Sequence, residues 1–119
     1  MKLFSATIEE FEVVPKIRLP LKMKWSKEGQ QYLSTKQALA WELKKCYHGK
    51  DPMTFEMSLS CAIHLRHRRG IDIDNAVGFI MDSLQYAGIV ENDRWIKEFK
   101  KVNLFQGKAN RVVVELRRL

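Results

Sequence analysis

The chain has 119 residues, 45% of them hydrophobic, and its 21 lysines and arginines exceed its 14 aspartates and glutamates, which gives a formal net charge of +7. This hydrophobic content excludes a wholly disordered chain, and the length favours one domain that spans residues 1–119. The positive charge favours a partner that carries phosphate, but charge alone does not distinguish DNA from RNA or from an anionic membrane surface.

The sequence gives no sign of a membrane segment or a zinc site. No apolar stretch reaches the roughly 20 residues that a membrane-spanning helix needs, and glutamates interrupt the N-terminal segment where a signal peptide would stay apolar. We therefore expect a soluble, cytoplasmic protein with no membrane partner. Cys46 and Cys61 lack the spacing of zinc ligands, so we interpret them as reduced packing residues.

The N-terminal part of the chain predicts a strand followed by a helix. β-Branched and aromatic residues favour a strand over residues 2–14, and prolines then interrupt the pattern. Apolar residues spaced by three and four predict a helix within residues 27–47. This helix begins either near Lys27 or near Thr35, because residues 34–37 have the form of a capping box.

The rest of the chain predicts three strands and one helix. Every second residue is apolar over residues 53–65, which is typical of a strand with one buried face. Helical spacing follows over residues 74–87, with Gly88 placed to end the helix, and two further strands are predicted over residues 95–105 and 111–119. The order β, α, β, α, β, β is typical of an α/β domain of the α+β type, with a single mixed, partly antiparallel sheet and two main helices.

The stretch "RHRRGIDIDN", residues 66–75, places three arginines and a histidine beside two aspartates. If the backbone there is extended, Asp72 and Asp74 point to the same side, while Ile71 and Ile73 point into the core. The pair lies where a strand or loop gives way to the second helix, so Asp74 is also a plausible N-cap residue.

Two interpretations of these carboxylates remain open. In the first, Asp74 caps the helix and Asp72 pairs with a neighbouring arginine, so that nothing binds. In the second, Asp93 adds a third carboxylate, provided that the strand after it pairs beside the first two, and the three hold Mg²⁺ or Mn²⁺. A metal ion next to a basic loop is suited to hydrolysis of a phosphodiester. The loop residues that would then contact phosphates are Arg66, Arg68 and Arg69.

Other polar residues are expected to have structural roles. Asp82 lies on the same helix face as Asp74 but about 12 Å along the axis, too far to share one ion. Glu91 and Asn92 are expected to be solvated turn residues, although either could be a metal ligand if the register shifts by one. His64 falls on the polar face of its predicted strand, where we expect an ordinary surface role. The basic residues of the C-terminal part form either a solvated sheet face or a surface that follows phosphates.

The segment "DIDNAVGFIMDSLQYAGIVENDRW", residues 72–95, resembles the signature of the RusA family of Holliday junction resolvases. That signature has Asp-x-Asp-Asn at the start of a helix, Asp-x-Leu in its middle, Ala-Gly at its end and an aspartate a few residues later. The segment "WSKEGQQY", residues 25–32, is similar to the Ser-x-Glu-Gly-x-x-Tyr pattern with which the family enters its first helix. The likeness covers residues 25–95.

The resemblance implies a function as well as a fold. It implies a homodimeric, Mg²⁺-dependent endodeoxyribonuclease that binds four-way DNA junctions and resolves them by paired nicks in recombination and repair, with no organic cofactor. It also makes a phage or prophage origin plausible. The metal-binding and catalytic residues that it implies are Asp72, Asp74 and Asp93.

The sequence departs from the family pattern at two places. The family commonly has a lysine four residues after the second aspartate, where this chain has Gly78, and Lys97 or an arginine of the basic loop could take over its contact with phosphate. The region before Trp25 also differs in length and composition. The alternatives are a catalytically weak or inactive junction-binding module of the same fold and a non-enzymatic RNA-binding protein.

Overall fold

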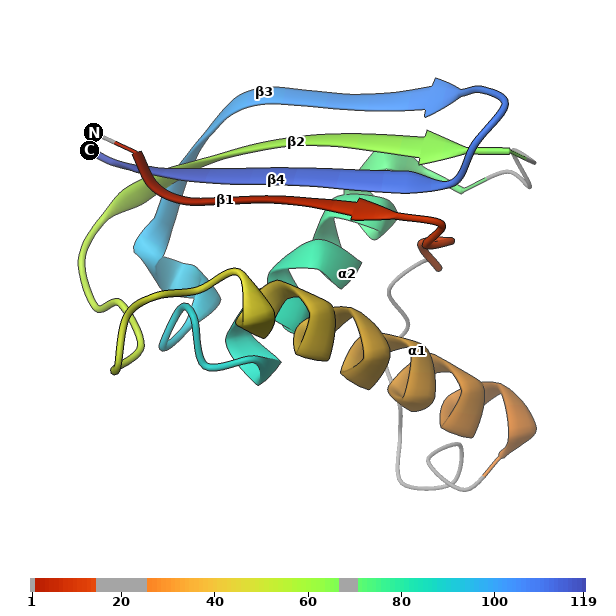
Figure 1. Ribbon diagram of the computed structural model, residues 1–119, viewed down its shortest axis with the longest axis horizontal. Helices are drawn as coiled ribbons and strands as arrows, with labels where there is room; N and C mark the ends of the chain where they lie inside the picture. The colour runs from red at the N-terminus through yellow and green to blue at the C-terminus, as the bar shows by residue number, and fades with distance from the viewer. Residues whose placement is uncertain (1, 15–25, 67–70) are drawn as a thin grey trace.

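A four-stranded mixed sheet carries both helices on one of its faces (Figure 1). The computed structural model describes residues 2–14, 26–66 and 71–119. The mixed sheet and the two helices confirm the predicted α+β architecture. The elements are β1 (Lys2–Glu9), α1 (Lys27–Lys45), β2 (Met57–Leu65), α2 (Ile73–Tyr86), the 3₁₀ turn η1 (Asp93–Trp95), β3 (Ile96–Gln106) and β4 (Arg111–Arg118).

The strand order β1-β4-β2-β3 places β1 and β3 at the edges of the sheet. Strand β4 is antiparallel to both β1 and β2, whereas β3 is parallel to β2. Parallel neighbours need a crossover connection, which α2 supplies here. Because α2 runs back along the sheet, its first turn lies near the carboxyl end of β2 and its last turn near the amino end of β3 (Figure 1).

Strand β3 is irregular along its pairing with β2. The register shifts twice, and the β3 residue that each shift leaves without an opposite partner is Lys97 in the first case and Lys100 in the second. Such bulges bend an edge strand and turn its side chains in new directions. Both extra residues are exposed lysines.

The core lies between the sheet and the helices. Alternate residues of β2 and β4 are buried, and they pack with apolar side chains of both helices, including Leu39, Leu43, Phe79 and Leu84. Burial raises the pKa of the Cys61 thiol to about 11. Both cysteines are free thiols, in agreement with the packing role that we expected for them.

Local hydrogen bonds fix the ends of both helices. The Ser26 side chain accepts a hydrogen bond from the Gly29 N–H at 3.0 Å, so α1 begins at Lys27. The alternative start near Thr35 is wrong, because the Thr35 hydroxyl donates to the Gln31 carbonyl inside the helix at 2.8 Å. Gly88 follows the end of α2 with a φ of 75°, a left-handed conformation that glycine adopts without strain, and this confirms the predicted end.

The end of the first predicted strand and the start of the second differ from the structure. Strand β1 ends at Glu9, and Glu10 then has a φ of 55° that breaks the extended backbone. Strand β2 begins at Met57, four residues later than predicted, because Met53 pairs elsewhere. Its N–H donates to the Ile89 carbonyl at 2.9 Å and its carbonyl accepts from the Glu91 N–H at 3.1 Å. An apolar residue at every second position therefore does not by itself show where strand pairing starts.

Among the described residues, no helix combines the length and the apolar character needed to cross a membrane.

Candidate active site

Asp72 and Asp74 lie in the first turn of α2. Asp72 is the N-cap residue, with φ −74° and ψ 147°, and its carbonyl accepts a hydrogen bond from the Ala76 N–H at 3.0 Å. The prediction that Asp74 is the N-cap is therefore wrong, because Ile73 already has helical backbone. Ile73 also does not enter the core as expected, since it is 45% exposed.

The two carboxylates are not used by the fold. Asp72 forms no side-chain hydrogen bond with the helix end that it caps, and among the described residues the Asp74 carboxylate accepts only from the next N–H, that of Asn75, at 3.0 Å. Both residues are exposed, and neither forms an ion pair with any part of the chain that the structure describes. The positive end of the helix dipole stabilises negative charge at this position.

An open hollow of about 530 Å³ lies in front of these carboxylates. Its walls are the first residues of α2, including Asp72 and Asp74, and the second half of β3, including Asn103. Sequence reasoning did not single out Asn103. Its position could have been inferred only from the parallel pairing of β3 with β2.

Asp93 lies at the opposite end of α2. Its N–H donates to the side chain of Gln85 at 3.2 Å, and Gln85 is eleven residues after Asp74 in the helix, which is about 16 Å along the axis. The start of α2 and the turn η1 lie at opposite ends of the sheet in Figure 1. Across residues 2–14, 26–66 and 71–119, no three His, Cys, Asp or Glu side chains are grouped so that they could hold a metal ion. One chain thus brings Asp72 and Asp74 together but leaves Asp93 apart.

The polar neighbours of Asp93 serve the local structure. Glu91 accepts from the Trp95 indole N–H at 3.0 Å and forms an ion pair with Arg94 at 3.6 Å. Asn92 caps η1 by accepting from the Arg94 N–H at 2.9 Å. Asp93 is the acidic residue of this turn whose carboxylate has no partner among the described residues.

Asp82 has the structural role that its spacing predicted. Its carboxylate accepts a hydrogen bond from the Tyr32 hydroxyl at 3.0 Å, and this contact joins α2 to α1. Asp82 therefore stabilises the packing of the two helices.

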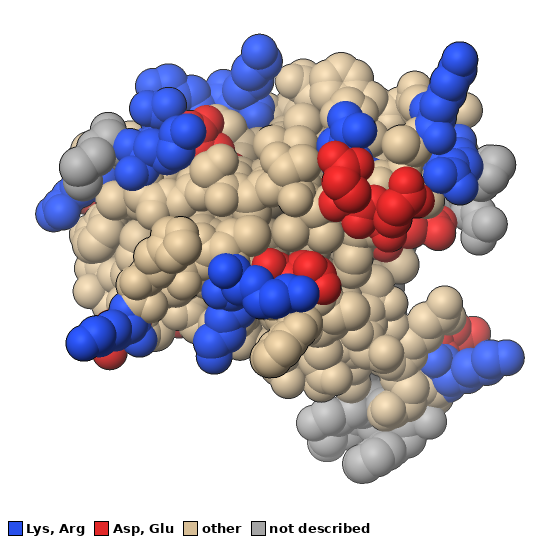
Figure 2. All heavy atoms as spheres, in the orientation of Figure 1, with Lys and Arg blue, Asp and Glu red and all other residues tan. Residues whose placement is uncertain are grey.

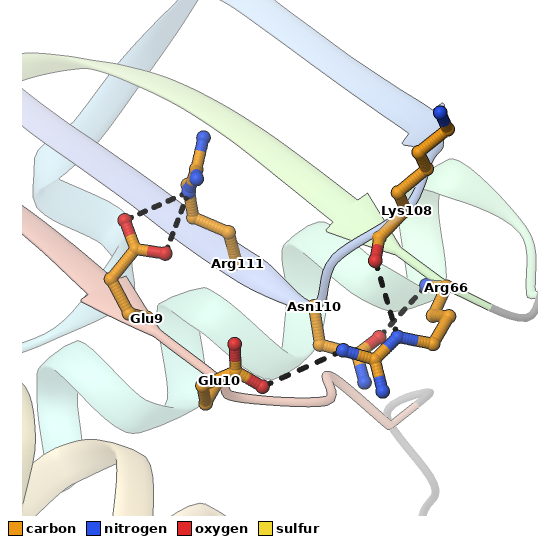
Figure 3. A network of polar contacts seen from close by, with 6 residues as sticks. All are labelled: Glu9, Glu10, Arg66, Lys108, Asn110 and Arg111. Atoms are coloured by element: carbon orange, nitrogen blue, oxygen red, sulfur yellow. Dashed lines mark hydrogen bonds and ion pairs between the residues drawn. The ribbon is translucent and has the colours of Figure 1, made fainter.

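Arg66 ties the carboxyl end of β2 to the turn between β3 and β4 (Figure 3). Its N–H donates to the Asn110 side chain at 2.8 Å, and its Nε donates to the Lys108 carbonyl at 3.2 Å. Its guanidinium also forms an ion pair with Glu10 at 3.6 Å. The side chain of Arg66 remains 47% exposed, so part of it stays open to a phosphate.

The other candidate DNA contacts are distributed along the chain. Arg68 and Arg69 lie outside the described residues. Lys97 is exposed at the start of β3, near Asp93, and forms no ion pair within the described chain. Figure 2 shows Lys and Arg side chains spread over the visible face, while Asp and Glu gather over the carboxyl end of β1. The positive charge is therefore not confined to the basic loop.

Gly78 lies one turn after Asp74 and is buried. An apolar groove of about 360 Å³ passes it between α2 and β3, and the exposed side chains of Ile73 and Phe99 border this groove. Among the residues that the structure describes, no lysine or arginine lines the groove. The described part of the chain therefore places no positive charge where the family has its lysine.

Comparison with known proteins places the chain in a family of DNA endonucleases. The family model described as "Endodeoxyribonuclease RusA" matches residues 10–117. A curated relative, "Crossover junction endodeoxyribonuclease RusA" of Aquifex aeolicus (strain VF5), is 31% identical over 77 residues, which cover 65% of this chain and 60% of the relative. The matched part is thus less than two thirds of the length of that relative. Because the family model spans most of the chain, this protein belongs to the RusA endodeoxyribonuclease family.

Proposed function

We propose that this protein is a crossover junction endodeoxyribonuclease that binds four-way DNA junctions and resolves them by paired, Mg²⁺-dependent nicks. Family membership supports the reaction class. The observation that carries the site is the pair of exposed carboxylates of Asp72 and Asp74, which the fold leaves without ion pairs at the mouth of an open hollow. The reaction would serve recombination and repair of DNA in the cytoplasm.

The donor set fits a hard divalent cation. Carboxylate oxygens are preferred ligands of Mg²⁺, and Mn²⁺ accepts the same oxygens. Bound there, such an ion supplies an activated water and offsets the charge that develops on the phosphate. Asp72 and Asp74 would hold it at the helix N-terminus, and Asn103 on the facing strand lines the same hollow.

The position of Asp93 supports a site shared between two copies of the chain. Within one chain Asp93 lies about 16 Å along α2 from Asp74, so it cannot complete the same ion site. In a homodimer, Asp93 of a second copy could approach Asp72 and Asp74 of the first. A two-fold dimer would then present two sites to the two strands of a junction that are nicked.

The basic residues would hold the DNA strands beside the site. Arg66 is anchored at the end of β2 and is half exposed, while Lys97 is exposed on the edge strand. Together with Arg68 and Arg69 they would contact phosphates. An arginine can donate two parallel hydrogen bonds to one phosphate where the geometry allows. Such contacts position the substrate without reading its sequence.

The test of the activity is a labelled synthetic four-way junction incubated with Mg²⁺ and either the wild type or Asp74→Asn. We expect paired nicks with the wild type and none with the variant, because the amide removes a negative ligand but keeps the shape of the side chain. Both proteins should bind the junction in the absence of metal. A preference for duplex DNA or RNA over the junction would refute the proposal.

Mixing two inactive variants tests the shared site. If Asp93 acts in trans, a heterodimer of Asp74→Asn with Asp93→Asn contains one intact site and one site that lacks both groups. The mixture should then nick one strand of the junction, whereas each variant alone should nick neither. If all three aspartates act within one chain, every site in the mixture is damaged and no nick appears.

The second candidate function is a junction-binding module that keeps the fold but has little turnover. Gly78 favours it, since no lysine or arginine among the described residues lines the groove beside Asp74, where it could stabilise phosphate charge. Tight binding of the junction by the wild type without nicks, at any Mg²⁺ or Mn²⁺ concentration, would select this function.

A further inference from the structure

The face of the sheet opposite the helices is open and carries its own hollow. Both helices lie on the other side (Figure 1), so the outward side chains of β2, β3 and β4 meet solvent. The small residues Ser60, Ala62 and Val113 form the floor of a shallow hollow of about 310 Å³. The taller side chains of Lys101, Asn103, Phe105 and Glu115 also line it.

A pair of stacked rings stands at this hollow. Phe105 is 44% exposed, and its ring stacks on the ring of His64, with 4.9 Å between the centroids and 20° between the planes. The two residues are direct neighbours across β2 and β3, so the backbone holds the pair in place. The stack fixes the orientation of the Phe105 ring, and a planar group can add to it with little loss of side-chain freedom.

The charged residues around the two rings favour an anionic ligand in this hollow. The acid that lines the hollow, Glu115, is already bonded to Arg117 at 2.9 Å, and the nearby Glu9 is bonded to Arg111 at 2.9 Å. Lys101 has no ion-pair partner within the described chain. A flat ring beside an unpaired cation matches the base and the phosphate of one nucleotide.

The hollow lies one strand away from the candidate metal ligands. Asn103 of β3 lines both this hollow and the hollow in front of Asp72 and Asp74. Because β3 is an edge strand, no further strand separates the two hollows along that side of the sheet. A DNA strand held at the first hollow can therefore pass around the edge of β3 and reach the second.

We propose that the open sheet face binds an unpaired nucleotide of the DNA substrate, with its base stacked on Phe105 and its phosphate beside Lys101. This inference rests on the proposed junction-cutting function, because a branch point offers bases that leave the duplex stack at low cost. The protein would recognise the branch point through this unpaired base. Stacking on an aromatic ring accepts any base, so this contact reads structure and not sequence.

The test uses a single-stranded oligonucleotide that carries 2-aminopurine, titrated with protein in the presence of EDTA. Stacking on Phe105 should quench the fluorescence of the base. Phe105→Leu should bind roughly tenfold more weakly or worse and lose the quenching. The matched control is Trp41→Leu, since Trp41 is a more exposed aromatic residue, at 66%, on α1, and it should bind as the wild type does.

A second variant tests the contact between the Lys101 ammonium and the phosphate. Lys101→Gln should keep the quenching but lower the slope of log affinity against log salt concentration by about 0.7, the value for one phosphate of a single strand. Equal binding by Phe105→Leu and the wild type would overturn the proposal. So would a halved molar mass of Phe105→Leu in light scattering, because this would show that a second copy of the chain covers the face.

Junction nicking in Mg²⁺ separates this inference from the proposed function. If the wild type nicks junctions while Phe105→Leu quenches normally, the nucleotide site is wrong and the nuclease stands. If the wild type fails to nick but Phe105→Leu loses the quenching, the nucleotide site stands and the nuclease is wrong.

Discussion

The two ends of α2 carry similar acidic residues but use them differently. At the first turn, Asp72 and Asp74 are exposed and have no ion pair within the described chain. Past the last turn, the carboxylate of Glu91 and the neighbouring amide of Asn92 are bonded into the turn that precedes β3. An acidic residue in a turn is therefore not a sign of function until the bonds of its side chain have been assigned.

Asp93 resembles Asp72 and Asp74 in having a carboxylate without an ion pair in the described chain, although it lies past the other end of α2. Its carboxylate is unbonded beside two bonded neighbours. This pattern favours Asp93 over Glu91 and Asn92 as the candidate ligand among residues 91–93.

The largest expected effect comes from exchanging Glu91 and Asp93, the two acids of the turn after α2, one at a time. Asp93→Asn should lower the rate of junction nicking by on the order of a thousandfold, because a metal ligand supplies several kcal/mol of transition-state stabilisation. Glu91→Gln, the matched control two residues away, should change the rate by less than about threefold, since the Trp95 indole can still donate to the amide oxygen. Equal losses in both variants would remove the distinction between bonded and unbonded acids.

A smaller effect is expected when charge is added to the first end. Gly78→Lys places an ammonium one turn after Asp74, along the groove between α2 and β3. We expect the nicking rate to rise roughly tenfold or more, because the lysine stabilises phosphate charge. Gly78→Ala is the control that adds a methyl group without charge, and it should leave the rate unchanged. An unchanged rate in both variants would mean that the groove does not face the phosphate.

A stability measurement tests whether Asn92 serves as the cap of η1. Asn92→Ala removes the cap of η1 and should lower the free energy of unfolding in urea by about 1 kcal/mol, whereas Asn92→Asp should keep the cap and the stability. Nicking by both variants should stay within about fivefold of the wild type. Loss of nicking by Asn92→Ala at unchanged stability would instead make Asn92 a ligand.

The smallest expected effect concerns the positive charge next to η1. Lys97→Gln should weaken junction binding a few-fold and lower the slope of log affinity against log salt concentration by about 0.9 for the loss of one phosphate contact. Lys45→Gln is the control, because Lys45 lies on α1 and is paired with Glu42 at 3.1 Å. A slope that does not differ between the two variants would exclude Lys97 from the DNA path.

The sequence predicted those parts of the fold that depend on local pattern. The alternation in residues 57–65 and the spacing in α2 follow from which side chains are buried, and Gly88 follows from the backbone that a helix end requires. Met53 shows the limit, since its alternation is that of a strand but its partners are Ile89 and Glu91. The alternation of apolar residues indicates which side chains are buried, whereas strand pairing depends on the rest of the chain.

The site was predicted less completely, for two physical reasons. Acids are favourable both at the N-cap and in the first turn of a helix, so Asp72 and Asp74 could not be told apart as capping residues. The place of Asp93 depends on whether β3 runs parallel or antiparallel to β2, and residue spacing does not encode that direction. The parallel pairing moves Asp93 to the far end of α2.

The two bulges of β3 also bear on how the protein behaves at high concentration. An edge strand offers unpaired N–H and C=O groups, and exposed apolar side chains such as Phe99 and Phe105 would make it a nucleus for aggregation. At Lys97 and Lys100 the regular spacing of those groups is interrupted, and a charge is added at each interruption. A second strand cannot pair along the whole of this edge without burying both ammonium groups. The irregular strand thus lets the molecule keep aromatic rings on its surface and still resist the growth of intermolecular β-sheets.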